Sequence, residues 1–549
     1  MRQLISYGAY LTEKERLRRR RSGKIHLKPL PEVPIEDAVC YSCGAELHKS
    51  DLYQQHRVCE VCGFHHSLSA YERIYILADP ASFEELDLIG ALSDPSKFIG
   101  NESYQERIRE AQERTGLSEA VVTGTCTIGG NPTVIAVLDF GFLGGNMGMV
   151  VGDRIARAFD TAVKQNLPIV TVVSSGGARI EEGVLSLVQM AKTVAVAKKL
   201  DNNRLPHISI LTHPTTGEVY ASFANLGDVI FAEPKAMIGF APIRTLQQSA
   251  DDSLSEMDHT AESHLEHGLI DQIVDRTRLR NMLSVTLDLL SSRYRLGMKK
   301  KVPQYFAPTN PPEQAWDTIQ LARHEARPTA LDYIFRITSA FVEIHGDRSY
   351  SDDPAVVCGF AELGGQAVVI IGQQGDRNEG HTSSEGFRKA RRGMKLAAKF
   401  GLPLITLIDT PGAYPGPESE ERGIGHGIAS TMALLIDLPT PVISVIIGEG
   451  GSEGALALGI ANRVLIMENA YLSVVSPERA ASIFSRDTSK ASSFASALRL
   501  TAADCRELGV VDVIVPEPRG GAHTDHVEAS RLLRNVIIRE LLQIQVKSP

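Results

Sequence analysis

The stretch LPIVTVVSSGGA at residues 167–178 has a counterpart, LPLITLIDTPGA at residues 402–413, located 235 positions further along the chain. In both, an apolar run ends in small residues, which is typical of a buried strand that enters a turn and then a helix. The same offset relates residues 121–135 to 356–370 and residues 207–228 to 442–463. Because the offset is constant over about 120 residues, we interpret the chain as one α/β unit that occurs twice.

Length and composition agree with two large domains. The chain has 549 residues, whereas a single hydrophobic core rarely grows beyond about 300. No apolar run approaches the ~18 residues of a membrane span, and no signal peptide is recognisable, so we expect a cytoplasmic protein without a membrane partner. The net charge of −9 disfavours nucleic acid as the main partner, although Arg18–Arg21 form a local basic run.

Four of the seven cysteines form a metal-binding pattern. Their spacing, C-x2-C-x15-C-x2-C, lets two short turns close around one tetrahedral Zn²⁺. The four are Cys40, Cys43, Cys59 and Cys62. Because four thiolates leave no open position for water, we expect one structural zinc ion per chain. A pair of redox CxxC sites is the disfavoured alternative, and the nearby His56, His65 and His66 are predicted to be bystanders.

Two glycine-rich turns are candidate anion sites. Ser175–Ala178 and Gly448–Ser452 each follow an apolar strand and precede a helix, so free backbone N–H groups converge there. Such donors can hold a developing oxyanion, although a tight turn without chemistry is the simpler reading of either one alone. No GxxxxGK[ST] loop, GxSxG elbow or HExxH motif occurs, which disfavours nucleotide hydrolysis and serine hydrolase chemistry.

Several longer stretches resemble one family. In the first half these are CEVCGFHH (59–66), FLGGNMGMVVGD (142–153), SSGGARIEEG (174–183) and LTHPTTGEVYASFANLGD (211–228), which resemble the β subunit of bacterial acetyl-CoA carboxylase carboxyltransferase. In the second half IDTPGAYPGPESEERGIG (408–425), VIIGEGGSEGALALG (445–459) and ELGVVDVIVPEPRGGAH (507–523) resemble its α subunit. The chain therefore resembles a natural fusion of the two, with the β half first.

The resemblance implies a fold, an activity and site residues. The family has the crotonase-like fold (ClpP/crotonase superfamily), so we expect two ββα-superhelix domains of the α/β class and a small zinc ribbon. The implied reaction moves a carboxyl group from carboxybiotin to acetyl-CoA and gives malonyl-CoA for fatty acid or polyketide synthesis. By similarity, backbone N–H groups stabilise two oxyanions, and which pair serves the thioester stays open. The implied donors are Gly176 and Gly177 in one half and Gly450 and Gly451 in the other.

The resemblance also sets the expected organisation and partners. We expect a basic arm at residues 1–36, the zinc ribbon at 37–66, a β-type domain at 67–300 and an α-type domain at 301–549. The boundary between residues 300 and 301 is placed within the basic and proline-rich segment 293–312, which is typical of an interdomain linker. No biotinyl-lysine motif or ATP-grasp-like region is recognisable, so a separate biotin carboxyl carrier protein and a separate ATP-using biotin carboxylase are expected. The family's paired halves suggest a homodimer of the fused chain.

Three positions depart from the family pattern. Glu218 and Glu453, which are 235 residues apart, replace glycines of the usual TTGGV and GGSGG motifs, and Arg479 replaces a glycine after SPE. A carboxylate at a helix start can be harmless capping, or it can weaken an anion site unless it turns to solvent or pairs with a cation such as Arg479. Altered acyl preference and neutral drift both stay open.

Three alternative functions remain open from the sequence. A carboxyltransferase for another acyl-CoA, or a malonyl-thioester decarboxylase component, would use the same oxyanion chemistry. A nucleic-acid-binding regulator would use the zinc ribbon and the Arg18–Arg21 run, and the acidic total charge argues against it.

Overall fold

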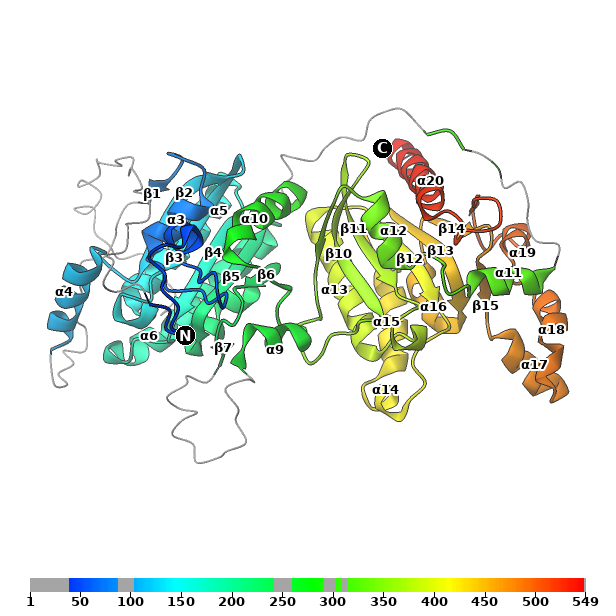
Figure 1. The fold of residues 1–549 in the computed structure, drawn as a ribbon, viewed down its shortest axis with the longest axis horizontal. Coiled ribbons are helices and arrows are strands. Elements are labelled where there is room, and N and C mark those ends of the chain that lie inside the picture. The colour runs from blue at the N-terminus through cyan, green and yellow to red at the C-terminus, as the bar shows by residue number, and fades with distance from the viewer. Residues whose placement is uncertain are drawn as a thin grey trace. The chain divides into compact units, whose positions relative to one another are not determined.

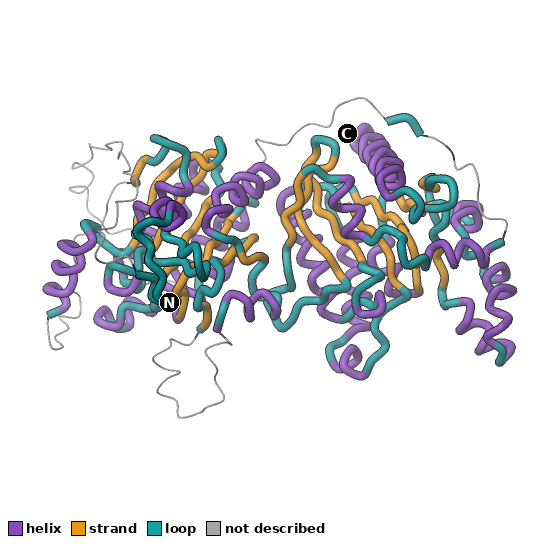
Figure 2. The backbone as a smooth tube through the Cα atoms, viewed as in Figure 1, coloured by secondary structure: helices purple, strands orange, loops and turns teal. Residues whose placement is uncertain are grey.

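The computed structural model describes residues 39–86, 103–240, 259–290, 303–305, 307 and 314–547. The predicted basic arm (residues 1–36) and most of the predicted linker segment lie outside these residues. Two compact units are present: unit 1 comprises Met1–Leu265 and Ile270–Asp288, and unit 2 comprises Glu266–Leu269 and Leu289–Pro549 (Figure 1). Figure 2 shows that the strands of each unit gather into a sheet that is flanked by helices.

The elements of the first part of the chain run from residue 51 to residue 290. They are α2 (Asp51–His56), α3 (Ala70–Leu77), β1 (Glu84–Glu85), α4 (Tyr104–Thr115), β2 (Val121–Ile128), β3 (Asn131–Leu138), η3 (Leu143–Gly145), α5 (Met149–Gln165), β4 (Ile169–Ser175), η4 (Ile180–Glu182), α6 (Val184–Asn202), β5 (His207–Thr216), α7 (Gly217–Tyr220), η5 (Phe223–Leu226), β6 (Val229–Ala232), β7 (Ile238–Gly239), α9 (Ala261–Glu266), β8 (Gln272–Ile273) and α10 (Arg276–Leu290).

The elements of the second part begin at residue 315. They are α11 (Ala315–Ala322), α12 (Ala330–Ile337), β9 (Ala340–Glu343), β10 (Val356–Leu363), β11 (Gln366–Gln373), η8 (Asn378–Gly380), α13 (Ser384–Phe400), β12 (Leu404–Thr410), α14 (Pro417–Glu421), α15 (Ile424–Ile436), β13 (Val442–Gly451), α16 (Ser452–Gly459), β14 (Arg463–Met467), β15 (Tyr471–Ser473), α17 (Pro477–Ser485), η9 (Thr488–Lys490), α18 (Ala491–Ala497), α19 (Ala502–Glu507), β16 (Val513–Val515) and α20 (His526–Lys547).

The predicted repeat is confirmed element by element. The strands β2, β3, β4 and β5 begin and end 235 residues before β10, β11, β12 and β13, and α5 has the same relation to α13. The two sheets have the same topology, with the strand orders β1-β2-β3-β4-β5-β6-β8 and β9-β10-β11-β12-β13-β14-β16. In each, an antiparallel hairpin is followed by parallel strands, so both sheets are mixed. The α/β class predicted from the sequence is therefore correct.

Helices cover both faces of the second sheet. A side chain placed at Gly372 of β11 would meet Ala330 of α12, whereas the neighbouring Ile371 packs against Gly393 of α13. Because successive strand residues point to opposite faces, α12 and α13 lie on opposite sides. The central strands of this sheet are consequently buried on both faces, as the mostly buried residues of β12 illustrate. This explains why the strand sequences read as continuous apolar runs.

Local capping fixes where several helices begin. Reciprocal capping boxes begin α3, α4, α12 and α19, and they pair Ser69 with Glu72, Ser103 with Glu106, Thr329 with Asp332 and Thr501 with Asp504.

Within the described ranges, no helix has both the length and the apolar character needed to span a bilayer.

The segment 315–344 differs in part from the sequence-based expectation. Its spacing predicts helix, and α11 and α12 confirm this for residues 315–322 and 330–337, whereas residues 323–329 between them form turns and loop. Residues Ala340–Glu343 instead form β9, which pairs antiparallel with β10. The pairing supplies hydrogen bonds at the sheet edge that outweigh the local helical pattern of four residues.

Candidate functional site

Each of the two cysteine pairs lies in the same kind of turn. The Gly44 N–H donates to the Cys40 carbonyl at 2.8 Å, and the Gly63 N–H donates to the Cys59 carbonyl at 2.8 Å. Gly44 and Gly63 have φ angles of 74° and 69°, in the left-handed region that favours glycine. The sequence Cys-x-x-Cys-Gly thus folds into two equivalent knuckles that point their thiols inward.

The four predicted cysteines come together into one group. The Sγ atoms of Cys40 and Cys62 are 3.6 Å apart, those of Cys43 and Cys59 are 3.7 Å apart, and all four lie within 4.8 Å of one another. A disulfide would need about 2.05 Å, so these are free thiols. A tetrahedral ion with metal–sulfur bonds of about 2.3 Å separates its ligands by about 3.8 Å, which matches these distances. The residues present therefore fit one thiophilic metal ion.

No histidine joins this group in the described part of the chain. His65 Nε2 lies 3.1 Å from Asp275 Oδ2, and His66 packs edge-on against Tyr53 and Phe64. Among the residues that the structure describes, the four cysteines are the one group of three or more such side chains that could hold a metal ion. That His56, His65 and His66 are bystanders to metal binding stays a prediction.

A buried ion cluster joins the four-cysteine module to the rest of unit 1. Arg276 donates from Nη1 to the carbonyls of His56 and His66, both at 2.9 Å, and from Nε and Nη2 to Glu233, both at 2.8 Å. Arg73 also pairs with Glu233. Burial alone would raise the pKa of Glu233, but the two guanidinium groups outweigh burial and hold that pKa well below its usual value.

The turn after β4 contains the first predicted glycine pair. Gly176 donates from its N–H to Gly144 O at 2.9 Å, and Gly177 donates to Ser175 Oγ at 3.1 Å. Met147 donates to Gly177 O at 2.8 Å, and Arg179 donates to Met147 O at 3.1 Å. An oxyanion that binds these glycine N–H groups therefore has to replace existing acceptors, of which the Ser175 hydroxyl is the more easily moved.

The turn after β12 repeats this arrangement in unit 2. Gly412 donates to Thr410 Oγ1 at 3.1 Å, Thr382 donates to Gly412 O at 3.3 Å, and Tyr414 donates to Thr382 O at 2.9 Å. The repeat equivalents of Gly176 and Gly177 are Pro411 and Gly412, so one donor is absent here. The two turns share their backbone bonds while their side chains differ.

The second predicted glycine pair lies elsewhere in the repeat. Gly450 and Gly451 end β13 and pair with Leu472 and Ser473 of β15, and they correspond to Thr215 and Thr216 of β5 rather than to the β4 turn. The helix α16 starts directly after them. The glycine pairs predicted for the two halves therefore occupy non-equivalent positions, which the sequence repeat alone would have revealed if applied to these residues.

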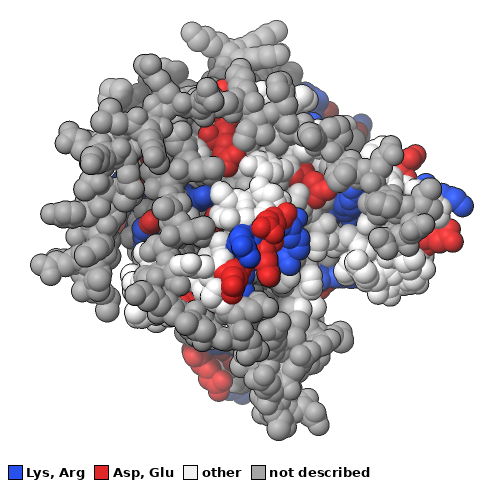
Figure 3. All heavy atoms as spheres, turned by 90° about the vertical axis from the view of Figure 1, so that its left-hand side faces the viewer, with Lys and Arg blue, Asp and Glu red and all other residues white. Residues whose placement is uncertain are grey.

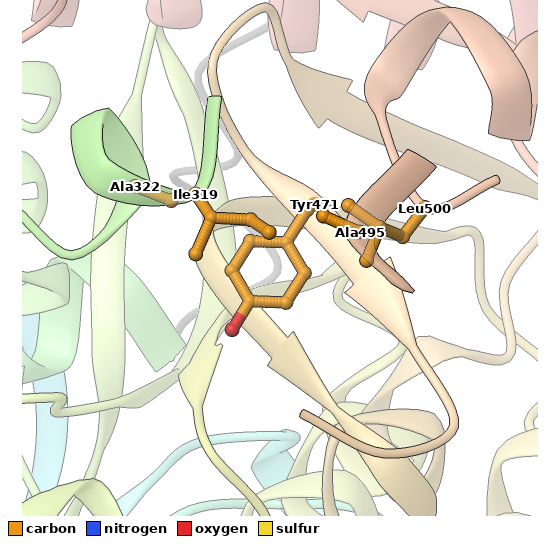
Figure 4. Packing of buried hydrophobic residues seen from close by; sticks show 5 residues of the cluster. All are labelled: Ile319, Ala322, Tyr471, Ala495 and Leu500. Atoms are coloured by element: carbon orange, nitrogen blue, oxygen red, sulfur yellow. The ribbon is translucent and has the colours of Figure 1, made fainter. Parts of the chain in front are cut away.

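Tyr471 anchors the strand beside Gly450. Its ring packs in a buried cluster with Ile319 and Leu500, together with Ala322 and Ala495 (Figure 4). Arg323 Nη2 donates to the Tyr471 hydroxyl at 2.8 Å and to Glu449 Oε1 at 2.9 Å. Because Arg323 also binds Glu478 at 2.7 Å, one guanidinium ties α11, β13, β15 and α17 together.

Arg179, which the sequence did not single out, directly follows the β4 turn and links it to neighbouring segments. Its fully buried guanidinium donates to Glu119 at 2.8 and 2.6 Å and to the Tyr104 hydroxyl at 3.1 Å. Burial lowers the pKa of Arg179, but the pairing with Glu119 outweighs it and raises that pKa above its ordinary value. The sequence signal that could have pointed to Arg179 is a single arginine directly after the small residues SSGGA at 174–178.

The two departing glutamates have different surroundings. Glu218 is half-buried, and its Oε2 accepts a hydrogen bond from the Ala178 N–H at 2.8 Å. Glu453 is exposed and contacts the hydroxyl of its neighbour Ser452. Arg479 is exposed at the start of α17, and it forms no ion pair with either glutamate in the described residues. The hypothesis that Arg479 compensates for one of them therefore has no contact to support it.

Asp409 gives a prediction for pH dependence. Its carboxyl lies between the backbones of Gly375 and Gly448 and accepts from the Glu449 N–H at 2.9 Å. Burial raises its pKa from 3.8 to about 7. Because the folded state then holds a proton that the unfolded state has lost, the free energy of unfolding should fall as the pH rises from about 4 through about 7. Urea unfolding of Asp409→Asn across this range should show a smaller fall, and an identical profile would contradict the assignment.

Comparisons with known proteins place this geometry in a family. The family described as "Acetyl co-enzyme A carboxylase carboxyltransferase-like" matches residues 297–549. The "Acetyl-coenzyme A carboxylase carboxyl transferase subunits beta/alpha" of Salinispora tropica is 44% identical over 526 residues, which cover 92% of each chain. The "Probable biotin-dependent acyl-coenzyme A carboxylase beta3 subunit" of Mycobacterium bovis is 34% identical over 470 residues, covering 85% of this chain and 92% of the relative.

A solved structure shows the same fold. The crystal structure of transcarboxylase 12S, described as a hexamer with methylmalonyl-coenzyme A and methylmalonic acid bound, superposes with a TM-score of 0.67 at 24% identity, over 86% of this chain and 90% of that one. The class is thus an α/β protein with the transcarboxylase fold. Within that class, the chain belongs to the family of acetyl-coenzyme A carboxylase carboxyl transferase β/α subunits.

Proposed function

We propose that the chain is the carboxyltransferase of an acetyl-CoA carboxylase, which moves a carboxyl group from carboxybiotin to acetyl-CoA and gives malonyl-CoA. The observation that carries this proposal is the 44% identity to a β/α carboxyl transferase over 92% of both chains, so that both halves are matched. The two crotonase-like domains that we propose correspond to the repeated α/β units, whose sheets share one topology.

The proposed chemistry needs backbone donors more than reactive side chains. In the proposed reaction the N–C bond of carboxybiotin would break, which releases CO2 and leaves negative charge on the biotin ureido oxygen. That anion would take the α proton of acetyl-CoA, and the resulting enolate, whose charge lies on the thioester oxygen, would attack CO2 to form malonyl-CoA. We assign stabilisation of the two developing oxyanions to the N–H groups of Gly176 and Gly177 in one half and of Gly450 and Gly451 in the other. Preorganised donors of this kind are each worth about 2.7–4 kcal/mol in the transition state.

The proposal includes a metal and partner proteins. The four cysteines would hold one Zn²⁺ that stabilises the module at residues 37–66 without taking part in the reaction. Carboxybiotin would be delivered by a separate biotin carboxyl carrier protein, which a separate biotin carboxylase would load. We further propose a homodimer of this chain that acts in the cytoplasm.

A transfer assay tests this function. The full chain is mixed with a carboxylated biotin carrier protein and with acetyl-, propionyl- or butyryl-CoA, and the products are separated. We expect malonyl-CoA as the main product. Transfer mainly to a longer acyl-CoA would support the alternative substrate, whereas decarboxylation of malonyl-CoA without any transfer would support the decarboxylase and overturn the proposal.

Gly177→Ala should separate catalysis from binding. Gly177 has a φ of 119°, which alanine rarely adopts, and an added Cβ would lie 2.6 Å from Glu218 Oε2, so alanine strains the turn and displaces that carboxylate. We expect kcat to fall about 10²- to 10³-fold while acetyl-CoA binding changes little. Gly425→Ala is the matched control, because no atom lies within 4 Å of its added Cβ. Retention of full kcat in Gly177→Ala would remove this turn from the mechanism.

The nucleic-acid-binding alternative receives little support from the charges. On the side shown in Figure 3, described Lys and Arg side chains lie beside Asp and Glu rather than in a patch of one sign. The helix α4, for example, carries both arginines and glutamates. The Arg18–Arg21 run lies outside the described residues, and salt-sensitive RNA retention by the full chain would be the observation that favours this alternative.

A further inference from the structure

Glu218 accepts a hydrogen bond from the last backbone N–H of the β4 turn, that of Ala178. Its carboxylate accepts from the Ala178 N–H at 2.8 Å, and its Oε2 lies so close to Gly177 that an added Cβ there would be only 2.6 Å away. The start of α7 is equally close, because a Cβ on Gly217 would lie 3.0 Å from the Gly177 Cα. A negatively charged side chain is thus bound next to the glycine N–H groups that we assign to an oxyanion.

Capping of α7, the helix that carries Glu218, does not explain this contact. The helix α7 has no side-chain cap, and Glu218 reaches across to another segment instead of bonding to its own first turn. Its carboxylate forms no ion pair with a described cation, so its negative charge is not neutralised locally. The backbone donor of Ala178 is therefore the group that holds the carboxylate in place.

The second half of the chain provides an internal comparison. Glu453 occupies the equivalent position, but it is exposed and contacts Ser452. The Ala413 N–H, equivalent to that of Ala178, has no acceptor within the described residues. The same residue type therefore occupies the turn in one half and faces away from it in the other.

We propose that Glu218 is a specificity-determining residue that disfavours acyl groups carrying their own carboxylate. The inference rests on the proposed function, because it requires the acyl group to reach the β4 turn. A neutral acetyl group then approaches a turn that bears one negative charge, whereas a malonyl group brings a second one. Like charges at short range repel, so Glu218 weakens binding of the carboxylated product relative to the substrate and favours its release.

Equilibrium binding to the full chain tests this without turnover. The dissociation constants of acetyl-CoA and malonyl-CoA are measured by calorimetry for the wild type, Glu218→Gln and Glu453→Gln. Glutamine keeps the size of the side chain and an acceptor for Ala178, and it removes only the charge. We expect Glu218→Gln to raise the affinity for malonyl-CoA relative to acetyl-CoA about tenfold, or 1.4 kcal/mol. Glu453→Gln should change the ratio less than about twofold, since its carboxylate is exposed.

Two outcomes would overturn the proposal. An unchanged ratio in Glu218→Gln would show that the charge is not felt by the acyl group, and an equal rise in Glu453→Gln would show a general charge effect. In either case carboxyl transfer by the wild type would leave the proposed function intact. Failure of the wild type to bind any acyl-CoA would instead overturn the proposed function and this inference with it.

Hydrogen exchange provides a measurement that does not depend on acyl-CoA. In Glu218→Ala the amide of Ala178 loses its acceptor, so exchange in a peptide that covers residues 176–179 should become faster than in the wild type. Glu453→Ala should leave this peptide unchanged. Equal exchange in the wild type and Glu218→Ala would show that the carboxylate does not hold the turn, and would contradict the proposal.

Discussion

Cys59→Ser is expected to lose its metal and to unfold the module around residues 39–66 while both sheets stay folded. A four-thiolate site that is reduced to three thiolates binds zinc far more weakly, and structural zinc supplies about 10–16 kcal/mol of apparent folding free energy in small modules. The module has only a small core of its own, built from Cys40, Leu47, Tyr53 and Cys59, and two of these residues are proposed metal ligands, so loss of the metal also loosens this core. Metal analysis should fall from about one zinc per chain to almost none, and proteolysis should cut first within this region.

Cys126→Ala provides the matched control for this experiment. Cys126 lies buried in β2 outside the metal group, and burial raises its pKa to about 12, so its thiol stays protonated and does not compete for the ion. This variant should keep its zinc and its resistance to protease. Metal loss from both variants, or full metal content in Cys59→Ser, would argue against a four-cysteine zinc site.

The Arg179→Met variant should show the largest loss of stability among substitutions near the β4 turn. It leaves the carboxylate of Glu119, which is 2% exposed, without its guanidinium partner. Breaking a buried ion pair in this way costs about 3–5 kcal/mol, because the remaining charge is neither hydrated nor paired. The midpoint of thermal unfolding should fall, and carboxyl transfer should fall with it, since Arg179 directly follows the turn.

Two further variants make the cause of this loss visible. Arg531 pairs with Glu528 on the exposed side of α20 at 2.6 Å, and Arg531→Met should cost less than about 1 kcal/mol. The double variant Arg179→Met with Glu119→Leu removes the stranded charge and should recover part of the stability. If Arg179→Met proved no more harmful than Arg531→Met, the buried pair would not be what stabilises this turn.

The sequence predicted those features that depend on local pattern and spacing. The offset of 235 residues predicted two equal units because strand and turn residues recur in order, and the cysteine spacing predicted which thiols meet. The sequence did not predict β9, because four residues that follow a helix become a strand only through pairing with β10. Contacts between distant segments, such as Arg179 with Glu119 or Arg276 with the carbonyls of His56 and His66, also leave no periodic signal.

For the candidate backbone donors, too, the sequence predicted the local turns but not the contacts with distant segments. The sequence located two glycine-rich turns, and the β4 turn follows a buried strand as expected. Its N–H groups, which were expected to be free, instead donate to Gly144 O, Ser175 Oγ and Glu218. It did not reveal that Gly450 and Gly451 belong to a sheet ladder, or that Glu218 turns inward while Glu453 turns outward. Side-chain direction depends on the packing of neighbouring elements, and neighbouring elements differ between the two halves even where the backbone agrees.

The backbone bonds that Met147 and Thr382 make to the two turns have an evolutionary consequence. Because each turn is fixed by main-chain atoms of a neighbouring segment, side chains can be exchanged at its positions other than Gly177 and Gly412 without loss of its shape. After duplication, mutation could therefore alter the chemistry of one turn while the other kept its ancestral task. Pro411, which stands at the repeat position of Gly176, is a difference of this kind between two halves that still fold alike.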